Sequence, residues 1–375
     1  MIDTTKLMLD KTMFWITNIS LFQKERQNAS RGYFTLVQNP TKTELLNGIY
    51  KPRLTLTKRF NASGRFEETL SIELSLPKLI YSNNFDELQD SDFPKVIEKL
   101  SEVLKTMGIM VFTNILSRAP VSTVHYSKNI PLTDGLTPHY LISKIKEANI
   151  TLALDVNQTD YQNDGHSYKW HSNYYEVAFY DKIQDLNNAK KHGDKRAIEK
   201  DNTLQLNLLG GFSQRKKLEV FRMEIRLNTR QKINQLFKTL KIEKELTFQS
   251  IFNSNTSQQI LLHYLDELER QRPKLLDYKT SSPRTLLVDL IINNPKLGVK
   301  QTIQLFGLKN AFDVVTPREL RAMFNNYTDR SWYRLIAQAK QIQLPKTRSP
   351  FRVIRDHLAC FEPLKLVYFQ ERSTN

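Results

Sequence analysis

Alternation of apolar and polar residues with a period of two recurs between residues 30 and 230, and it limits the fold more than any other feature. In "LEVFRMEIRLNTR" (218–230), the apolar side chains point one way, and Arg222, Glu224 and Arg226 point the other way. The same pattern occurs in "TLSIELSLP" (69–77), "VSTVHYSKNI" (121–130), "ANITLALDV" (148–156) and "YYEVAFYDKIQDL" (174–186). Such strands are typical of an antiparallel sheet that is covered on one face.

Helical spacing separates some of these strands. Residues 93–108 and 137–148 have apolar residues three and four positions apart, and Gly108 is placed to end the first helix. We expect these helices to cover the apolar face of the sheet. The sequence therefore predicts an α+β fold, an antiparallel sheet with helices on one face, whose polar face is left for chemistry.

The pattern becomes helical after about residue 232. Pro273 and Pro283 bracket "KLLDYKTSS", the best linker candidate, so we predict a large domain over residues 1–275 and a small helical domain over residues 284–375. Residues 298–324 of the tail are expected to form a helix, a glycine turn and a second helix. This segment fits a helix-turn-helix, although any small helical bundle gives a similar pattern.

The charge of the chain favours a polyanionic partner. Lys and Arg number 55 against 39 Asp and Glu, giving a formal charge of +16 and a pI near 9.6. A nucleic acid explains this surplus better than a ribosome-associated or merely basic protein, or a membrane surface. No apolar run approaches the roughly 18 residues of a membrane span. The single cysteine, Cys360, excludes an internal disulfide, fits a reducing cytoplasm and is expected to be a small core residue.

Familiar catalytic motifs are absent, including the phosphate-binding glycine loop, the G-x-S-x-G elbow and the H-E-x-x-H helix. The polar sheet face instead combines acids, an imidazole, a phenol and cations. Each of these has an ordinary structural explanation when taken alone, but their convergence favours a site. The candidates are Glu73, His125, Tyr180, Lys182, Arg222, Glu224 and Arg226.

This set of groups suits phosphodiester transfer. A phenol has a pKa near 10, so Tyr180 needs help to attack phosphorus at neutral pH. Lys182, two residues further on, could lower that pKa or stabilise the transition state. Carboxylates and an imidazole could hold Mg²⁺ or Mn²⁺. A covalent tyrosyl–DNA link would conserve the bond energy for later rejoining.

Several of these stretches carry a family resemblance. "VAFYDKIQDL" and "FRMEIRLNTR" resemble the tyrosine strand and the R-x-E-x-R strand of the gene-two/gene-ten replication proteins, the rolling-circle initiators of filamentous phages and related plasmids. "SIELSLPKLI" is similar to another family segment, and "VSTVHYSKNI" stands where the family has an R-I-D-type strand. "RSWYRLIAQAKQIQLPK" is similar to its C-terminal helical motif, so the resemblance touches roughly residues 70 to 345.

The resemblance implies an HUH/Rep-like catalytic domain that nicks and rejoins one DNA strand at an origin through a 5′-phosphotyrosine and leaves a 3′-OH primer. Tyr180 is the implied nucleophile, Lys182 its partner and Glu224 an active-site acid. Metal ligands for Mg²⁺ or Mn²⁺ are expected at Glu73, His125 and Glu224, although His125 replaces the family's aspartate. DNA contacts are expected from Arg222, Arg226 and Arg230.

Implied partners are single-stranded and duplex origin DNA and a host helicase, without a membrane, in the cytoplasm of a bacterial host. The His-hydrophobic-His pair of most related nickases is missing from the sequence; His166 and His171 could form a loop pair.

Three other interpretations stay open. Staphylococcal-type plasmid initiators share a comparable Y-x-K and R-x-E arrangement, so the subfamily is open. A non-catalytic origin-binding protein of winged-helix type would explain the charge and the helical tail. A tyrosine recombinase would carry its nucleophile near the C-terminus of a helical domain, whereas Tyr180 lies in mid-chain.

Overall fold

A computed structural model of the chain defines the fold. It describes residues 1–28, 33–60, 64–132, 135–148, 159–162, 165–185, 219–279, 282–324, 326–345 and 349–365. The predicted strand in residues 148–156 lies almost entirely outside these ranges.

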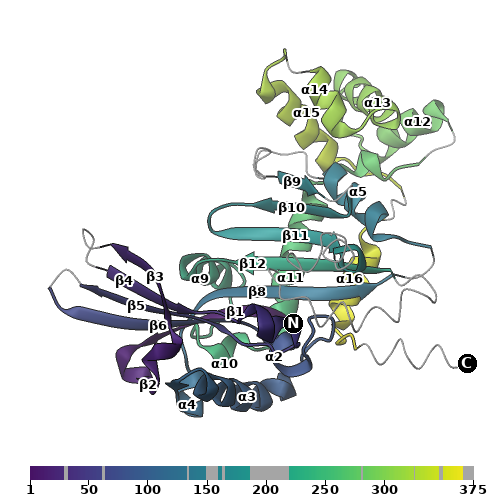
Figure 1. Cartoon of the computed structure of the whole chain (residues 1–375). Helices are drawn as coiled ribbons and strands as arrows, with labels where there is room; N and C mark the ends of the chain where they lie inside the picture. The colour runs from purple at the N-terminus through teal and green to yellow at the C-terminus, as the bar shows by residue number, and fades with distance from the viewer. Residues whose placement is uncertain are drawn as a thin grey trace, which may run out of the picture.

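Within the described ranges, the main feature is a ten-stranded antiparallel sheet with the order β3-β4-β5-β6-β1-β8-β12-β11-β10-β9 (Figure 1). The sheet strands are β1 Ile2–Asp10, β3 Gln23–Asn28, β4 Tyr33–Gln38, β5 Arg53–Phe60, β6 Phe66–Ser75, β8 Val121–Pro131, β9 Thr159–Gln162, β10 Ser167–His171, β11 Tyr175–Asp181 and β12 Val220–Leu227. A separate two-stranded sheet pairs β2 Trp15–Ile16 with β7 Ile109–Met110.

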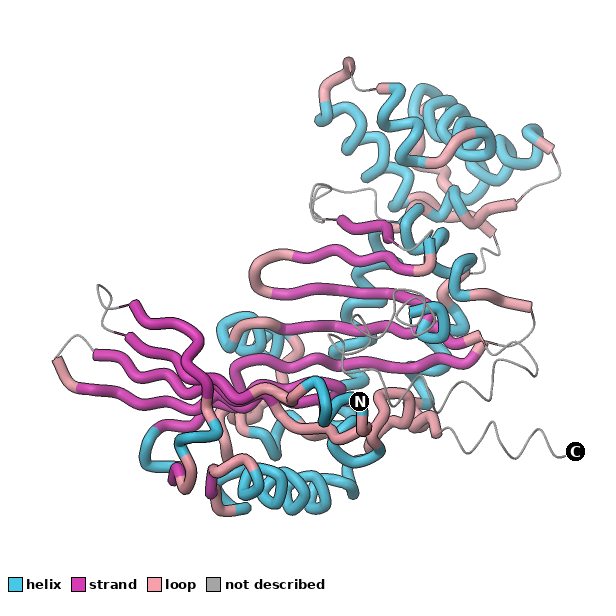
Figure 2. The backbone as a smooth tube through the Cα atoms, viewed as in Figure 1, coloured by secondary structure: helices cyan, strands magenta, loops and turns pink. Residues whose placement is uncertain are grey.

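In the view of Figure 2, helices lie behind the central strands, below the β1–β6 part of the sheet and beyond its β9 edge. They are α1 Lys42–Leu46, α2 Leu76–Tyr81, α3 Phe93–Thr106, α4 Thr113–Ser117, α5 Pro138–Ala148, α9 Arg230–Thr239, α10 Phe248–Ile251, α11 Ser254–Gln271, α12 Pro283–Asn293, α13 Val299–Val314, α14 Pro317–Met323, α15 Asp329–Gln341 and α16 Arg352–Cys360. None of the described helices is long and apolar enough to cross a bilayer.

One face of the sheet is buried in the main hydrophobic core, as the period-two pattern predicts. From β12 the core takes Phe221, Met223, Ile225 and Leu227, and helices α3, α5, α9, α11 and α16 cover the same face. Gly108 ends the α3 region with φ +75°, where a Cβ would come within 2.8 Å of the Asn18 carbonyl oxygen. The structure thus confirms an α+β fold of helices on a large antiparallel sheet.

The last described helix, α16, packs on this core and not on helices α12 to α15. Phe351, Ile354 and Leu358 belong to the main core, so the predicted domain of residues 284–375 does not hold together as one unit. Apolar residues on one side of α16 pack against α11 and β8. Cys360, at the end of α16, is exposed and is not a core residue.

A buried ion pair fastens this returning segment to the sheet. Lys128 of β8 donates to the Glu87 carboxylate and, at 2.6 Å, to the Glu362 carbonyl oxygen. Glu87 also accepts from the backbone amides of Asn129 and Leu364, at 2.7 and 2.9 Å. Burial would raise the pKa of Glu87, but Lys128 and these donors hold it below its ordinary value.

A second hydrophobic core defines the small helical domain. It is built from α12 to α15, and it also includes Leu275 and Tyr278. Part of the expected linker is therefore packed, because these two residues are buried against the helices. The expected glycine turn is also absent, since α13 continues through Gly307 and the chain turns at residues 315–316.

The Glu87–Lys128 pair yields a stability prediction. Lys128→Met should lower the free energy of unfolding by about 3–5 kcal/mol, because it leaves the Glu87 carboxylate buried without its counter-ion. Lys99→Met is the matched control, since the Lys99–Glu102 pair is exposed and should contribute less than about 1 kcal/mol. Urea unfolding monitored by circular dichroism measures both. Equal losses would show that the buried pair does not anchor the segment.

Candidate functional site

The candidate site lies on the polar side of three adjacent strands. In the register, Arg222 is opposite Tyr180 of β11, Glu224 is opposite Ala178, and Arg226 is opposite Glu176. On the other side of β12, the same three residues face Asn129, Ser127 and His125 of β8. Because alternate side chains of paired strands share a face, the pairing gathers these groups without any loop.

A hydrogen bond joins the predicted nucleophile to the predicted acid. The Tyr180 hydroxyl donates to Glu224 Oε2 at 2.8 Å. Tyr180 is partly exposed at the end of β11, whereas Glu224 is only 2% exposed. Burial raises the pKa of Tyr180 well above its ordinary value, so the phenol stays protonated at neutral pH. It can act as a nucleophile only if a neighbour takes its proton.

Two guanidinium groups hold the Glu224 carboxylate. Arg226 Nε donates to Glu224 Oε1 at 2.8 Å, and its Nη1 donates to Glu176 at 2.7 Å. Arg222 Nε lies 3.5 Å from Glu224 Oε2, and Arg222 Nη2 lies 3.2 Å from Asp3; these are ion-pair contacts without good hydrogen-bond geometry. Burial would raise the pKa of Glu224, but Arg226, Arg222 and the nearby imidazole hold it far below its ordinary value.

His125 adds an uncharged imidazole to the site. Its Nδ1 lies 3.6 Å from Glu224 Oε1. Burial lowers the pKa of His125 to about 4, although the neighbouring Glu224 acts in the opposite direction. The ring is therefore neutral at pH 7, and its contact with Glu224 is not an ion pair at that pH.

Lys182 lies just past the end of β11, where its hydrogen-bond partner is Asn84. Its Nζ donates to Asn84 Oδ1 at 2.6 Å, and the side chain is 2% exposed. Burial, followed by repulsion from Arg222, lowers the pKa of Lys182 to about 7. Arg222 and Arg226 both act to lower the pKa of the Tyr180 phenol, against the larger effect of burial.

The polar face is covered where Arg222 lies. Arg222 Nη1 donates to the Asn84 carbonyl oxygen at 3.0 Å and to Asn129 Oδ1 at 3.1 Å. Asn129 in turn donates to the Phe85 carbonyl oxygen at 2.9 Å. At 2% exposure, Arg222 has no free donor surface for a phosphate, whereas the Arg226 side chain is 33% exposed.

The remaining predicted residues lie away from this cluster. Glu73 is exposed on β6, opposite Lys6, and two strands separate it from β12, a distance of about 14 Å. Arg230 is exposed as the first residue of α9. His166 pairs with Asp181 at 3.3 Å, while the side chain of His171 lies outside the described set.

The predicted divalent cation does not fit the donors as the structure places them. Both Glu224 oxygens already face guanidinium nitrogens, His125 is the only other predicted ligand beside them, and Glu73 is remote. Among the described residues, no group of three His, Cys, Asp or Glu side chains could hold a metal ion.

Four residues of the cluster were not among the predicted site residues: Asp3, Asn84, Asn129 and Glu176. The period-two pattern places Glu176 and Asn129 on the polar face, so a stricter reading of the strands would have found them. Asn84 carries no sequence signal, because it reaches the site from a loop.

In comparisons with protein families, curated proteins and solved structures, the chain matches none of them.

The depressed pKa of Lys182 yields a pH prediction. Below pH 7 the lysine is charged in the folded and unfolded states, so its burial penalty is fully present. Between about pH 7 and the ordinary value of 10.5, only the unfolded chain holds the proton, so this group makes stability rise with pH.

Lys182→Met removes this burial penalty. The free energy of unfolding of the variant, relative to that of wild type, should therefore be higher at pH 6 than at pH 9.5, by up to a few kcal/mol at about 1.4 kcal/mol for each pKa unit. Urea unfolding at the two pH values measures the difference, and the exposed Lys99→Met serves as control. The loss of the Asn84 contact contributes equally at both. A difference that does not change with pH would contradict the burial of an ionisable amine.

Proposed function

We propose that the chain is a DNA nicking and joining enzyme that initiates rolling-circle replication through a covalent bond to Tyr180. In this proposal the sheet and its helices form a catalytic domain of the HUH/Rep type, acting on origin DNA in the bacterial cytoplasm. The observation that carries the proposal is the hydrogen bond from the Tyr180 hydroxyl to Glu224, at a partly exposed position between two arginines.

The proposed reaction is a transesterification, in which one phosphate ester bond forms as another breaks. Tyr180 Oη attacks phosphorus, a phosphotyrosine bond forms, and the bond to the 3′-oxygen breaks. The phenolic proton passes to Glu224 Oε2, its hydrogen-bond acceptor. The departing 3′-oxygen takes a proton from water, and the hydroxide left behind takes the proton from Glu224, so no net proton is gained or lost. Attack by a 3′-hydroxyl on the phosphotyrosine reverses these steps and rejoins the strand, with Glu224 returning the proton.

The arginines explain how a carboxylate with a depressed pKa could act as the base. In the free site, Arg222 and Arg226 stabilise the Glu224 anion and so weaken it as a base. A phosphodiester bound beside the partly exposed Arg226 would share that positive charge, and the basicity of Glu224 would rise. Arg226 would then neutralise charge that develops on the phosphate. Buried Arg222 would act as a positioning residue.

The leading alternative is a non-catalytic origin-binding protein, in which the same cluster only holds β8, β11 and β12 together. It accounts for the buried Arg222 and for the positive charge. It gives no reason for a partly exposed phenol to donate to a buried carboxylate, and the experiments below separate the two functions.

The first test is Tyr180→Phe, which removes one oxygen and keeps the ring. We expect no covalent adduct with labelled single-stranded origin DNA on a denaturing gel, while DNA binding stays within about twofold of wild type. Tyr174→Phe is the matched control, since Tyr174 is 54% exposed six residues away, and it should keep the adduct. An adduct formed by Tyr180→Phe would place the nucleophile elsewhere.

The second test is Glu224→Gln, which keeps the shape of the side chain but cannot accept the proton. We expect adduct formation to slow by about 10²–10⁴-fold, as for loss of a general base, in a folded protein. Thermal unfolding checks the fold, because the two arginines lose a carboxylate partner. Glu176→Gln, which also removes a carboxylate from Arg226, should slow the reaction far less. Equal effects would assign Glu224 a purely structural role.

A parallel pair of reactions, with Mn²⁺ and with excess EDTA, tests the predicted cation. If the adduct is lost in EDTA, a metal is required and needs donors beyond Glu224 and His125. If it forms in EDTA, the arginines supply the positive charge of the site.

A further inference from the structure

The small helical domain carries a charge surplus of its own. Residues 282–345 contain nine Lys and Arg against four Asp and Glu. These residues are distant in sequence from Tyr180, and the helices that carry them pack around a separate hydrophobic core. The location of the unpaired cations within the domain decides what it can bind.

Helix α15 has two sharply different faces. Trp332, Ile336 and Ala339 are buried in the domain core. The opposite face carries Arg330 and Arg334, both exposed, one helical turn apart, and then the half-buried Gln338 and the exposed Gln341. A row of two arginines and two glutamines thus follows the outer side of the helix.

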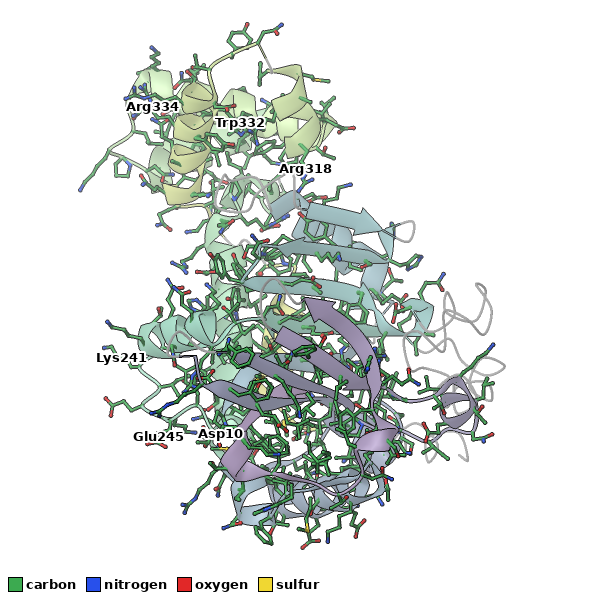
Figure 3. All side chains as sticks on the ribbon, turned by 60° about the vertical axis from the view of Figure 1, so that its left-hand side comes forward. Asp10, Lys241, Glu245, Arg318, Trp332 and Arg334 are labelled. Atoms are coloured by element: carbon green, nitrogen blue, oxygen red, sulfur yellow. The ribbon has the colours of Figure 1, made fainter. Side chains whose placement is uncertain are left out.

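The two arginines of the preceding helix, α14, already have partners within the protein. Arg318 donates to the Tyr168 hydroxyl of β10 at 2.8 Å, and Arg321 lies 3.6 Å from Asp329. In the part of the chain that the structure describes, neither Arg330 nor Arg334 has a carboxylate within salt-bridge distance. Figure 3 shows Arg334 on the outer side of the domain, whereas Arg318 lies at the side nearest the strands.

We propose that α15 is a recognition helix that reads duplex DNA in the major groove. With 13 residues, it is about 20 Å long, and a major groove about 12 Å wide accepts an α-helix. Arginine and glutamine are side chains that pair with the edges of guanine and adenine. Helix α13 packs against both α14 and α15, and Leu320 of α14 shares the domain core with Trp332 of α15, so α14 and α15 are the two consecutive helices of the proposed helix-turn-helix.

The proposed recognition helix lies further along the chain than the helix-turn-helix expected from the sequence. The sequence placed a candidate helix-turn-helix in residues 298–324, but α13 is continuous there and α14 is followed by residues 324–328 and then α15. The assignment rests on the proposed function only in that the duplex read is taken to be the origin.

The test uses the full chain and a pool of random duplex 30-mers, from which wild type selects a preferred sequence over several rounds. Arg330→Gln/Arg334→Gln should bind the selected duplex about tenfold or more weakly and lose the sequence preference. The slope of log affinity against log salt should fall by about one for each phosphate contact that is lost. Fluorescence anisotropy measures both quantities.

Arg284→Gln/Lys300→Gln is the matched control. It removes the same charge from exposed positions of α12 and α13 in the same domain, and it should change affinity less than about threefold. Equal weakening by the two double variants, with the preference retained, would reduce α15 to general charge attraction. Unchanged binding by Arg330→Gln/Arg334→Gln would overturn the proposal and leave another partner, such as an acidic protein, for this face.

The outcome is distinguishable from that of the proposed function. Duplex selection repeated with Tyr180→Phe does not require cleavage, and Arg330→Gln/Arg334→Gln should still form the adduct with single-stranded DNA. Either result can therefore fail while the other holds.

Discussion

Strand β12 must satisfy opposite requirements on its two faces, and the rest of the large domain follows from this. Phe221, Met223, Ile225 and Leu227 require a helical cover, whereas Arg222 and Glu224 on the other face are also buried. A buried charge is tolerated only with partners of opposite sign and satisfied hydrogen bonds. Other strands supply such partners, since Asn129 of β8 accepts from Arg222, Tyr180 of β11 donates to Glu224, and Asp3 of β1 lies 3.2 Å from Arg222. The strand pairing that builds the sheet therefore also sets the geometry of the site.

The same charge pairing sets the resting state of the site. Burial raises the pKa of Tyr180, while the arginines depress that of Glu224, so the phenol and the carboxylate hold fixed protonation states across neutral pH. Proton transfer between them is unfavourable until the positive field changes. An anion that competes for the arginines is the simplest cause of such a change. Under the proposed function, the substrate phosphate would itself prepare the base.

Local patterns predicted most of the central fold, because strand and helix periodicity depends on neighbouring residues. Strands β6, β8, β11 and β12 and helices α3 and α5 lie where the sequence places them. The face shared by Tyr180 and Glu224 was predictable for the same reason. The burial of Arg222 was not, since it depends on a loop carrying Asn84 folding over the sheet. Nor was the remoteness of Glu73, which depends on strand order, or the return of α16 to the main core.

A contact between Arg318 and Tyr168 joins the small helical domain to the sheet. Arg318 of α14 binds the Tyr168 hydroxyl, and Tyr168 pairs in the sheet with Phe179, the residue before Tyr180. The guanidinium also lies over the Tyr168 ring, 5.8 Å from its centroid. Residues 324–328 connect α14 to α15, so this contact links the domain that carries the reading helix to the strands next to the nucleophile. A duplex held by α15 would then enter at a set distance from Tyr180, so that recognition at one site would determine which phosphate is cut at the other.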